Sequence, residues 1–250
     1  MNKITNSTKI IFGLVILVAL LSSISIFFPQ DLIVQISGQD FPAPKPIMAF
    51  ASFFIVLILY GGLGFIGLKL SSKINLPDIW DEKITIKQKI LFPVFIGTII
   101  GIIFIIVDII YTKAFSIKQL HPDFPFSIVA SLTAGIGEEI IFRLFLISFW
   151  VWLISNKIFK SKYFNQIFWI ISIFSAISFS VGHIPSLMFL GGYNTFYEIP
   201  TVLIAEIIFL NSLLSVSCAY YFKKYGIISA IVLHFWVDII WHVIWGIIVK

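Results

Sequence analysis

The sequence predicts an all-α, polytopic membrane helical bundle with about seven (six to eight) transmembrane helices. Of its 250 residues, 59% are hydrophobic and 12% are charged, whereas a soluble domain carries about 25% charged residues. The mean hydropathy is +1.05, which leaves too little polar surface to cover a water-facing globule. The apolar residues are also gathered into runs of the length, about 20 residues, that a helix needs to cross a bilayer. We therefore expect the lipid bilayer to surround most of the chain.

Seven apolar runs are expected to span the membrane. They are residues 10–28, 47–69, 91–112, 125–155, 164–184, 200–222 and 226–249. Ser23-Ile-Ser25 at the end of the first run resembles a signal-peptide cleavage site. However, the run is longer than the apolar part of a signal peptide usually is, so we predict that it is not cleaved and remains as a transmembrane helix. The fourth run is too long for a straight crossing and must tilt or end in an interfacial stretch.

The lysines predict the orientation. Twelve of the 16 fall at the N-terminus or in the second, fourth and sixth gaps between the apolar runs. The other four are Lys45, Lys113, Lys118 and Lys250. Because cytoplasmic loops are enriched in Lys and Arg, we predict a multi-pass protein of the cell membrane with a cytoplasmic N-terminus and a cytoplasmic loop at 70–90. The net charge of +5 does not indicate nucleic-acid binding, since no block of five or six like charges occurs.

The chain is predicted to form one membrane domain with two parts. Residues 1–120 hold the first three transmembrane helices and the loop 70–90, and residues 121–250 hold the core helices with most of the ionisable residues that lie inside apolar runs. The single cysteine, Cys218, excludes an intramolecular disulfide and is interpreted as a small buried apolar residue.

Ionisable residues inside the apolar runs are candidates for function, because each costs at least about 2.5–3.5 kcal/mol at the centre of a membrane helix. They are Asp108, Glu138, Glu139, Arg143, His183, Glu206, His234, Asp238 and His242. Glu139 and Arg143 are four residues apart and can pair on one helix face, while Glu138 points about 100° away. A purely structural ion pair is the open alternative for this motif.

Two histidines complete the candidate set. His183 follows Phe179 by four residues, and His234 precedes Asp238 by four, so that a carboxylate could hold the imidazole tautomer. Glu138 as general base, with His183 and His234 positioning water or a metal ion, would suit the activation of water. One shared site requires tilted helices or a fifth span shifted by a turn or two, because residue counts place Glu138, His183 and His234 at different depths.

Other polar residues are predicted to have structural rather than catalytic roles. His242 is assigned to the membrane interface. Glu198, Glu206, Asn211 and the loop 191–194 are interpreted as loop and packing residues rather than as a route for substrate. Serine-based hydrolysis is less well supported, because no GxSxG motif occurs.

Three motifs in order carry a resemblance to a known family. They are Glu138-Glu139-x-x-x-Arg143, Phe179-x-x-x-His183 and His234-x-x-x-Asp238. This set resembles the CPBP family of CAAX-processing and bacteriocin-processing intramembrane proteases, also called the Abi family, over about residues 125–245. The resemblance implies a helical membrane bundle and an endopeptidase.

The resemblance also implies a role for each motif residue. Glu138 would be the base for a water held with His183 and His234, braced by Glu139, Arg143 and Phe179. Asp238 would stand on the oxyanion side, where many relatives have asparagine. An ionised aspartate cannot donate a hydrogen bond there, so Asp238 is either protonated, orients His234, or reduces activity.

The cofactor and the substrate stay open. A divalent metal such as zinc, held by His183, His234 and Glu138, and a metal-free mechanism are both compatible with the residues. The expected partners are a peptide or membrane-protein substrate and the lipid bilayer, with prenylation of the substrate left open. A non-catalytic immunity or scaffold protein that binds a peptide or a partner's helix is the main alternative. A proton-coupled transporter with a carboxylate relay is less supported, since no inverted repeat is found.

Overall fold

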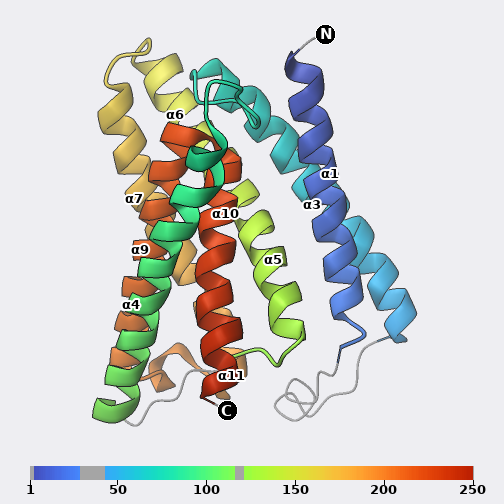
Figure 1. Ribbon diagram of the computed structural model, residues 1–250, viewed down its shortest axis with the longest axis vertical. Helices are drawn as coiled ribbons and strands as arrows, with labels where there is room; N and C mark the ends of the chain where they lie inside the picture. The colour runs from blue at the N-terminus through green and yellow to red at the C-terminus, as the bar shows by residue number, and fades with distance from the viewer. Residues whose placement is uncertain (1–2, 29–42, 116–120, 250) are drawn as a thin grey trace.

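The computed structural model describes residues 3–28, 43–115 and 121–249, and within these ranges all regular structure is helical (Figure 1). The α-helices are α1 (Lys3–Ser25), α3 (Lys45–Lys73), α4 (Phe92–Phe115), α5 (Phe126–Glu138), α6 (Ser148–Val151), α7 (Phe164–Gly182), α8 (Ile184–Gly191), α9 (Thr201–Tyr225), α10 (Ile227–Asp238) and α11 (Gly246–Ile248). Wider π-helical turns are η1 (Lys87–Leu91), η2 (Glu139–Ile147), η3 (Trp152–Ile158) and η5 (Ile239–Trp245), and η4 (Phe196–Glu198) is a 3₁₀ turn. The predicted helical class is confirmed.

Six helices in the described ranges are long and apolar enough to cross a membrane. They are Asn6–Ser25, Lys45–Lys73, Lys87–Phe115, Phe164–Phe189, Thr201–Tyr225 and Ile227–Ile248. They correspond to six of the seven predicted spans. The protein is therefore a multi-pass membrane protein, within the predicted range of six to eight helices.

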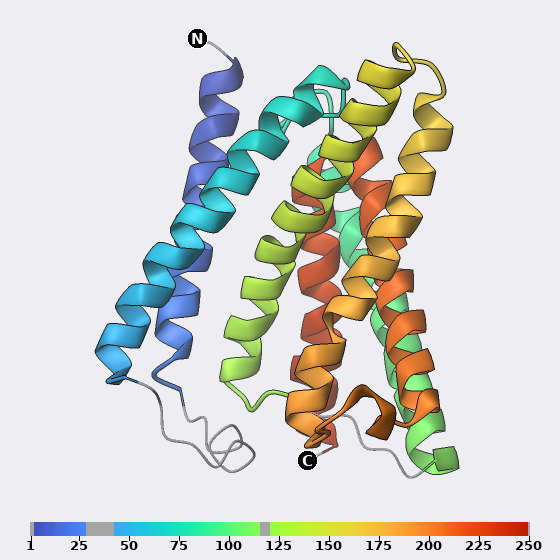
Figure 2. The ribbon, with the colours of Figure 1, turned by 180° about the vertical axis from the view of Figure 1, so that it is seen from behind.

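The remaining predicted span, 125–155, forms one unbroken helical run from Phe126 to Ile158, made of α5, η2, α6 and η3. This run leans across the bundle among the apolar helices (Figure 2), in the way its length requires. It begins at the end of the molecule where the chain finishes and reaches the end where the chain starts. Since it carries Glu138, Glu139 and Arg143, the charged motif lies within the bundle.

Small residues allow the helices around this run to approach closely. A Cβ on Gly135 of α5 would meet the Phe235 backbone of α10 at 3.0 Å, and one on Gly67 of α3 would meet the Leu144 carbonyl oxygen at 2.5 Å. Membrane helices associate through such close packing because lipid supplies no hydrophobic force between them. α10 thereby contacts α4, α5 and α9 and occupies the middle of the bundle.

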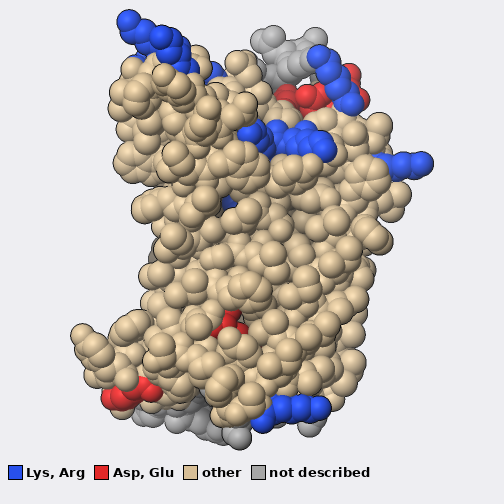
Figure 3. Space-filling model, turned by 90° about the vertical axis from the view of Figure 1, so that its left-hand side faces the viewer, with Lys and Arg blue, Asp and Glu red and all other residues tan. Residues whose placement is uncertain are grey.

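The surface divides into an apolar belt and two ends. Large apolar side chains on the outer helix faces are exposed, with Ile58 at 73% and Ile170 at 64%, a pattern that suits contact with lipid tails. In Figure 3 the middle of one face is almost free of basic side chains, which gather mainly at one end. The described lysines of the loop 70–90 belong to that end; Lys118 and Lys250 lie outside the described residues. Which end faces the cytoplasm stays a prediction.

Candidate active site

His183 stands at a bend between two helices. α7 ends at Gly182, and α8 starts at Ile184 with Pro185 in its first turn. Proline lacks an N–H and its ring clashes with the carbonyl four residues earlier, so it ends the preceding helix. The Nδ1–H of His183 donates to the Phe179 carbonyl oxygen at 2.8 Å, because a carbonyl can only accept. The tautomer is thereby fixed, and Nε2 is left to accept a hydrogen bond or to ligate a metal.

His234 of α10 is held by a carboxylate from another helix. Its Nδ1 donates to Glu139 Oε1 at 2.8 Å, and the same oxygen lies 3.1 Å from Nη1 of Arg143. Glu139 and Arg143 are fully buried. The predicted Glu139–Arg143 pair is thus present in the structure, and the same carboxylate also fixes the orientation of His234.

The second nitrogen of His234 faces two other acids. His234 Nε2 lies 3.7 Å from Glu138 Oε2 and 3.7 Å from Asp238 Oδ2. The sequence predicts that the carboxylate at i+4, Asp238, holds the tautomer, but Glu139 is the hydrogen-bonded partner at Nδ1. Asp238 instead lies beside Nε2, on the side of Glu138.

The Phe179 ring joins these groups. Its centroid lies 4.8 Å from that of His183 and 5.7 Å from that of His234, both edge to face. The Arg143 guanidinium carbon lies 4.9 Å from the same ring centroid. Since both imidazoles contact the Phe179 ring, His183 and His234 lie at a similar depth in the bundle. Counting residues along each span did not predict this.

A cavity of about 450 Å³ lies in front of this cluster, within the size range of small-molecule and peptide pockets. Glu138, His183, His234 and Asp238 line it, while Glu139, Arg143 and Phe179 stand behind them. The side chain of Glu138 is 29% exposed, against 0% for Glu139. The two adjacent glutamates thus have different surroundings, one on the cavity and one in the protein interior.

Polar residues that the spacing of motifs did not single out as functional also line the cavity, among them Glu206, Asn211 and His242. Glu206 and Asn211 belong to one face of α9, and His242 belongs to η5. The sequence predicts His242 at the membrane interface, but the structure places it on the cavity, with its Nδ1 3.3 Å from Nδ1 of His121. Their ionisable or amide character inside an apolar run was the available signal, but only the packing of α9 and η5 shows that they share the cavity.

Asp108 does not join the site. Its carboxylate accepts a hydrogen bond from Trp245 Nε1 at 2.6 Å, and it is absent from the cavity lining. Glu198 is also elsewhere, accepting hydrogen bonds from Asn194 and Thr195 in an exposed loop. These two acids have structural partners that account for their positions.

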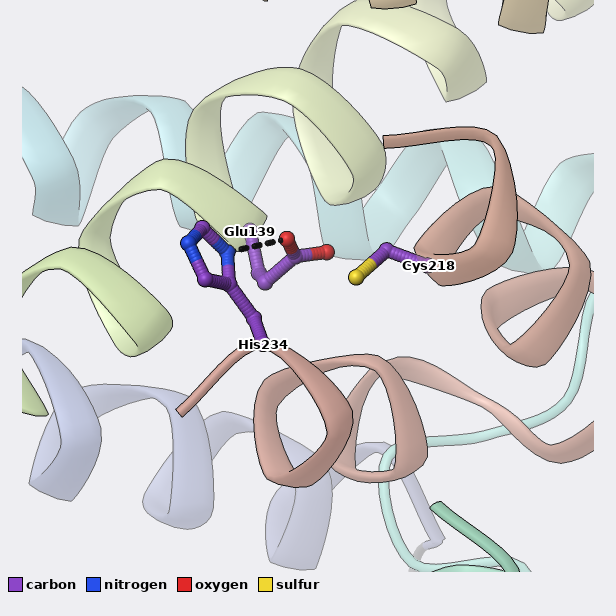
Figure 4. A group of neighbouring side chains, drawn as sticks. All are labelled: Glu139, Cys218 and His234. Carbon is purple, nitrogen blue, oxygen red and sulfur yellow. Dashed lines mark hydrogen bonds and ion pairs between the residues drawn. The ribbon is translucent and has the colours of Figure 1, made fainter. Parts of the chain in front are cut away.

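Two groups of residues could be considered for a metal ion. Glu139, Cys218 and His234 each offer a ligand atom within 4.8 Å of the others (Figure 4). However, the His234 Nδ1 in this group donates to Glu139, and the Arg143 guanidinium already neutralises that carboxylate. This group therefore does not suit a cation.

The cavity offers a second set of possible ligands, although its members are not among the described groups whose ligand atoms all lie within 4.8 Å of one another. His183 and His234 both engage Nδ1 with an acceptor of the protein, the arrangement that holds a metal-ligating imidazole through Nε2. With Glu138 they make the three protein ligands that are usual in catalytic zinc sites. The same donor atoms would equally hold a water molecule.

Comparison with known proteins gives one match. Residues 120–240 match the family model described as Type II CAAX prenyl endopeptidase Rce1-like. All the motif residues named above lie in the matched range. No curated protein and no solved structure matches the chain.

Proposed function

Because residues 120–240 form a Type II CAAX prenyl endopeptidase Rce1-like domain of the CPBP family, we propose that this membrane protein is an intramembrane endopeptidase. The observation that supports it best is the cavity on which Glu138, His183 and His234 meet inside the bundle. A partly buried carboxylate, 29% exposed, beside two oriented imidazoles is the set that water activation needs.

In the proposed reaction, a water molecule lies between Glu138 and the Nε2 atoms of the two histidines. Glu138 removes a proton from the water, and the hydroxide attacks the carbonyl carbon of the scissile peptide bond. The protonated Glu138 then gives its proton to the leaving nitrogen as the C–N bond breaks. A metal ion bound by the same three side chains would supply Lewis-acid activation of that water.

Glu139 and Arg143 act as positioning residues in this proposal, because they contact the histidine side of the site and not the cavity. Asp238 lies 3.7 Å from His234 Nε2 and balances the charge of an imidazolium there. His234 can then donate a hydrogen bond to the developing oxyanion, a role that an ionised aspartate cannot fill.

The test is peptide cleavage by the purified protein in liposomes, with farnesylated and unmodified peptides, with and without a chelator. We expect Glu138→Gln to abolish cleavage, since glutamine keeps the shape of the side chain but cannot accept the proton of water. Glu82→Gln, the same exchange outside the cavity, serves as the matched control. Loss of activity with the chelator would show metal dependence; cleavage retained by Glu138→Gln would overturn the proposal.

One observation favours a second candidate. Asp238 is an acid at a position where a hydrogen-bond donor is expected, and a protein that performs no chemistry would tolerate it. A non-catalytic membrane protein that binds a peptide or a partner helix in the same cavity is therefore the alternative. It would be supported if the folded wild-type protein bound peptides but cleaved none.

A further inference from the structure

Two histidines from distant parts of the chain face each other beside the cavity. His121 lies in the segment before α5, and His242 lies in η5, where it lines the cavity. Their Nδ1 atoms are 3.3 Å apart although the residues are 121 positions apart in the sequence. The chain has four histidines, and the proposed chemistry uses only the other two, His183 and His234.

The separation of the two nitrogens suits a shared metal ion. Two imidazoles that bind one tetrahedral zinc ion at the usual Zn–N length hold their nitrogens about 3.3 Å apart. A hydrogen bond from an N–H group is usually slightly shorter, at about 2.7–3.2 Å. The ring centroids of His121 and His242 are 5.5 Å apart, and their planes are inclined at 69°, so the rings converge at Nδ1 and do not stack.

Neighbouring groups hold the His121 ring in this position. Its centroid lies 4.7 Å from that of Trp241, edge to face. A Cβ on Gly246 would meet the Cβ of His121 at 2.9 Å, so the absence of a side chain there lets His121 pack against the last helix. Both histidines are partly exposed, which leaves an ion a route to them, as a metal site requires.

The pair would supply two protein ligands. Among the described residues, no third His, Cys, Asp or Glu ligand atom lies within 4.8 Å of both nitrogens; the group that meets this limit is Glu139, Cys218 and His234. Water would therefore complete the coordination of an ion held here. Imidazole nitrogen favours zinc, copper and nickel over calcium or magnesium.

We infer that His121 and His242 bind a divalent transition-metal ion such as Zn²⁺, at a position separate from Glu138, His183 and His234. The ion would lie beside the cavity, because His242 follows Asp238 by about one helical turn and both line it. It would tie the segment before α5 to the last transmembrane helix. This inference goes beyond the proposed endopeptidase function and does not depend on it, since metal binding is measured without a substrate.

The experiment counts bound zinc. The full chain, purified through a tag that contains no histidine, is placed in nanodiscs and dialysed against Zn²⁺, and the bound metal is measured by elemental analysis. We expect His121→Gln and His242→Gln each to bind one zinc ion fewer per chain than the wild type. Glutamine can still donate and accept a hydrogen bond, but it is a poor zinc ligand. Asn211→Gln, an exchange on the cavity outside the pair, should leave the count unchanged.

Thermal unfolding gives a second readout. An ion that binds the folded state raises its stability as the ion concentration rises. Zn²⁺ should therefore raise the unfolding temperature of the wild type more than that of either glutamine variant. His242→Cys keeps a side chain that ligates zinc and should recover both the bound ion and the shift, which a role of His242 in packing alone would not produce.

Equal zinc counts and equal zinc-dependent shifts in the wild type and both glutamine variants would overturn the inference and leave the pair as a hydrogen bond only. The two substitutions lie on different elements, so if one variant fails to fold, the other still decides the question. Failure of the proposed function is separate, because it is seen as absent peptide cleavage and leaves the zinc count unaffected.

Discussion

At the scale of single residues, Glu139 connects the parts of the site that never touch the cavity. Its Oε1 accepts from His234 Nδ1 at 2.8 Å and lies 3.1 Å from Arg143 Nη1. A buried carboxylate with only one of these partners would carry a large desolvation cost, which the paired arrangement offsets. The arginine therefore stabilises the acid, and the acid in turn orients the imidazole.

Glu139→Gln should lower kcat about 10–100-fold, the usual effect of removing the carboxylate that orients an active imidazole. The amide can present its NH₂ group to Nδ1, which would turn the ring or exchange its tautomer. KM should change little, because Glu139 does not line the cavity. Steady-state kinetics on the best peptide found for the wild-type protein would measure both values.

Cys218→Ala is the matched control, because the Cys218 thiol lies in the same buried group but has no part in the proposed mechanism. We expect kcat to remain close to that of the wild type. A loss as large as that of Glu139→Gln, accompanied by loss of a bound metal, would instead make Cys218 a ligand and contradict the conclusion that the buried group does not suit a cation.

Spacing within one helix identified Glu138, Arg143 and His234 as candidates, because helix geometry relates residues three or four positions apart. It could not show that His234 pairs with Glu139, 95 residues away in the sequence. It also could not show that Glu206 and His242 line the cavity, because this depends on how α9 and η5 are rotated relative to the neighbouring helices. Long-range side-chain partners are set by packing, for which a single sequence carries no signal.

At the scale of helices, the site depends on how closely α5 and α10 approach. Gly135 lies one turn before Glu138 and Glu139, and a Cβ there would meet the Cα, Cβ and N atoms of Phe235 at 3.0 Å. Phe235 directly follows His234. The glycine therefore sets the separation between the two glutamates and the histidine.

Gly135→Val should destabilise the fold by about 1–3 kcal/mol, as overpacking of a well-packed contact does, and should also lower activity. The added methyl groups meet backbone, which cannot rotate away, so α5 and α10 must move apart. Thermal unfolding in detergent and peptide cleavage would measure the two effects. Gly62→Val in α3, where a Cβ meets nothing within 4 Å, should show neither; equal effects in both variants would contradict this account.

At the scale of the whole molecule, the path of the chain agrees with the predicted arrangement of seven apolar runs. The described chain starts at one end of the bundle and finishes at the other (Figure 1). Six of the predicted runs form helices long and apolar enough to cross a membrane, and the other forms the helical run from Phe126 to Ile158. Hydropathy predicted these segments well because contact with lipid constrains every residue of a span. The predicted division of the chain into residues 1–120 and 121–250 has no such physical constraint behind it.

The lysine bias predicts which end faces the cytoplasm, and labelling can measure it. In a Cys218→Ala background, a single cysteine would replace Ser72 at the Lys-rich end or Tyr197 at the opposite end; Ser72 is exposed, and Tyr197 is 94% exposed. A membrane-impermeant maleimide should label Tyr197→Cys on intact cells, and Ser72→Cys only after permeabilisation. The physical reason is that positively charged loops are retained on the cytoplasmic side during insertion. The reverse pattern would invert the predicted orientation.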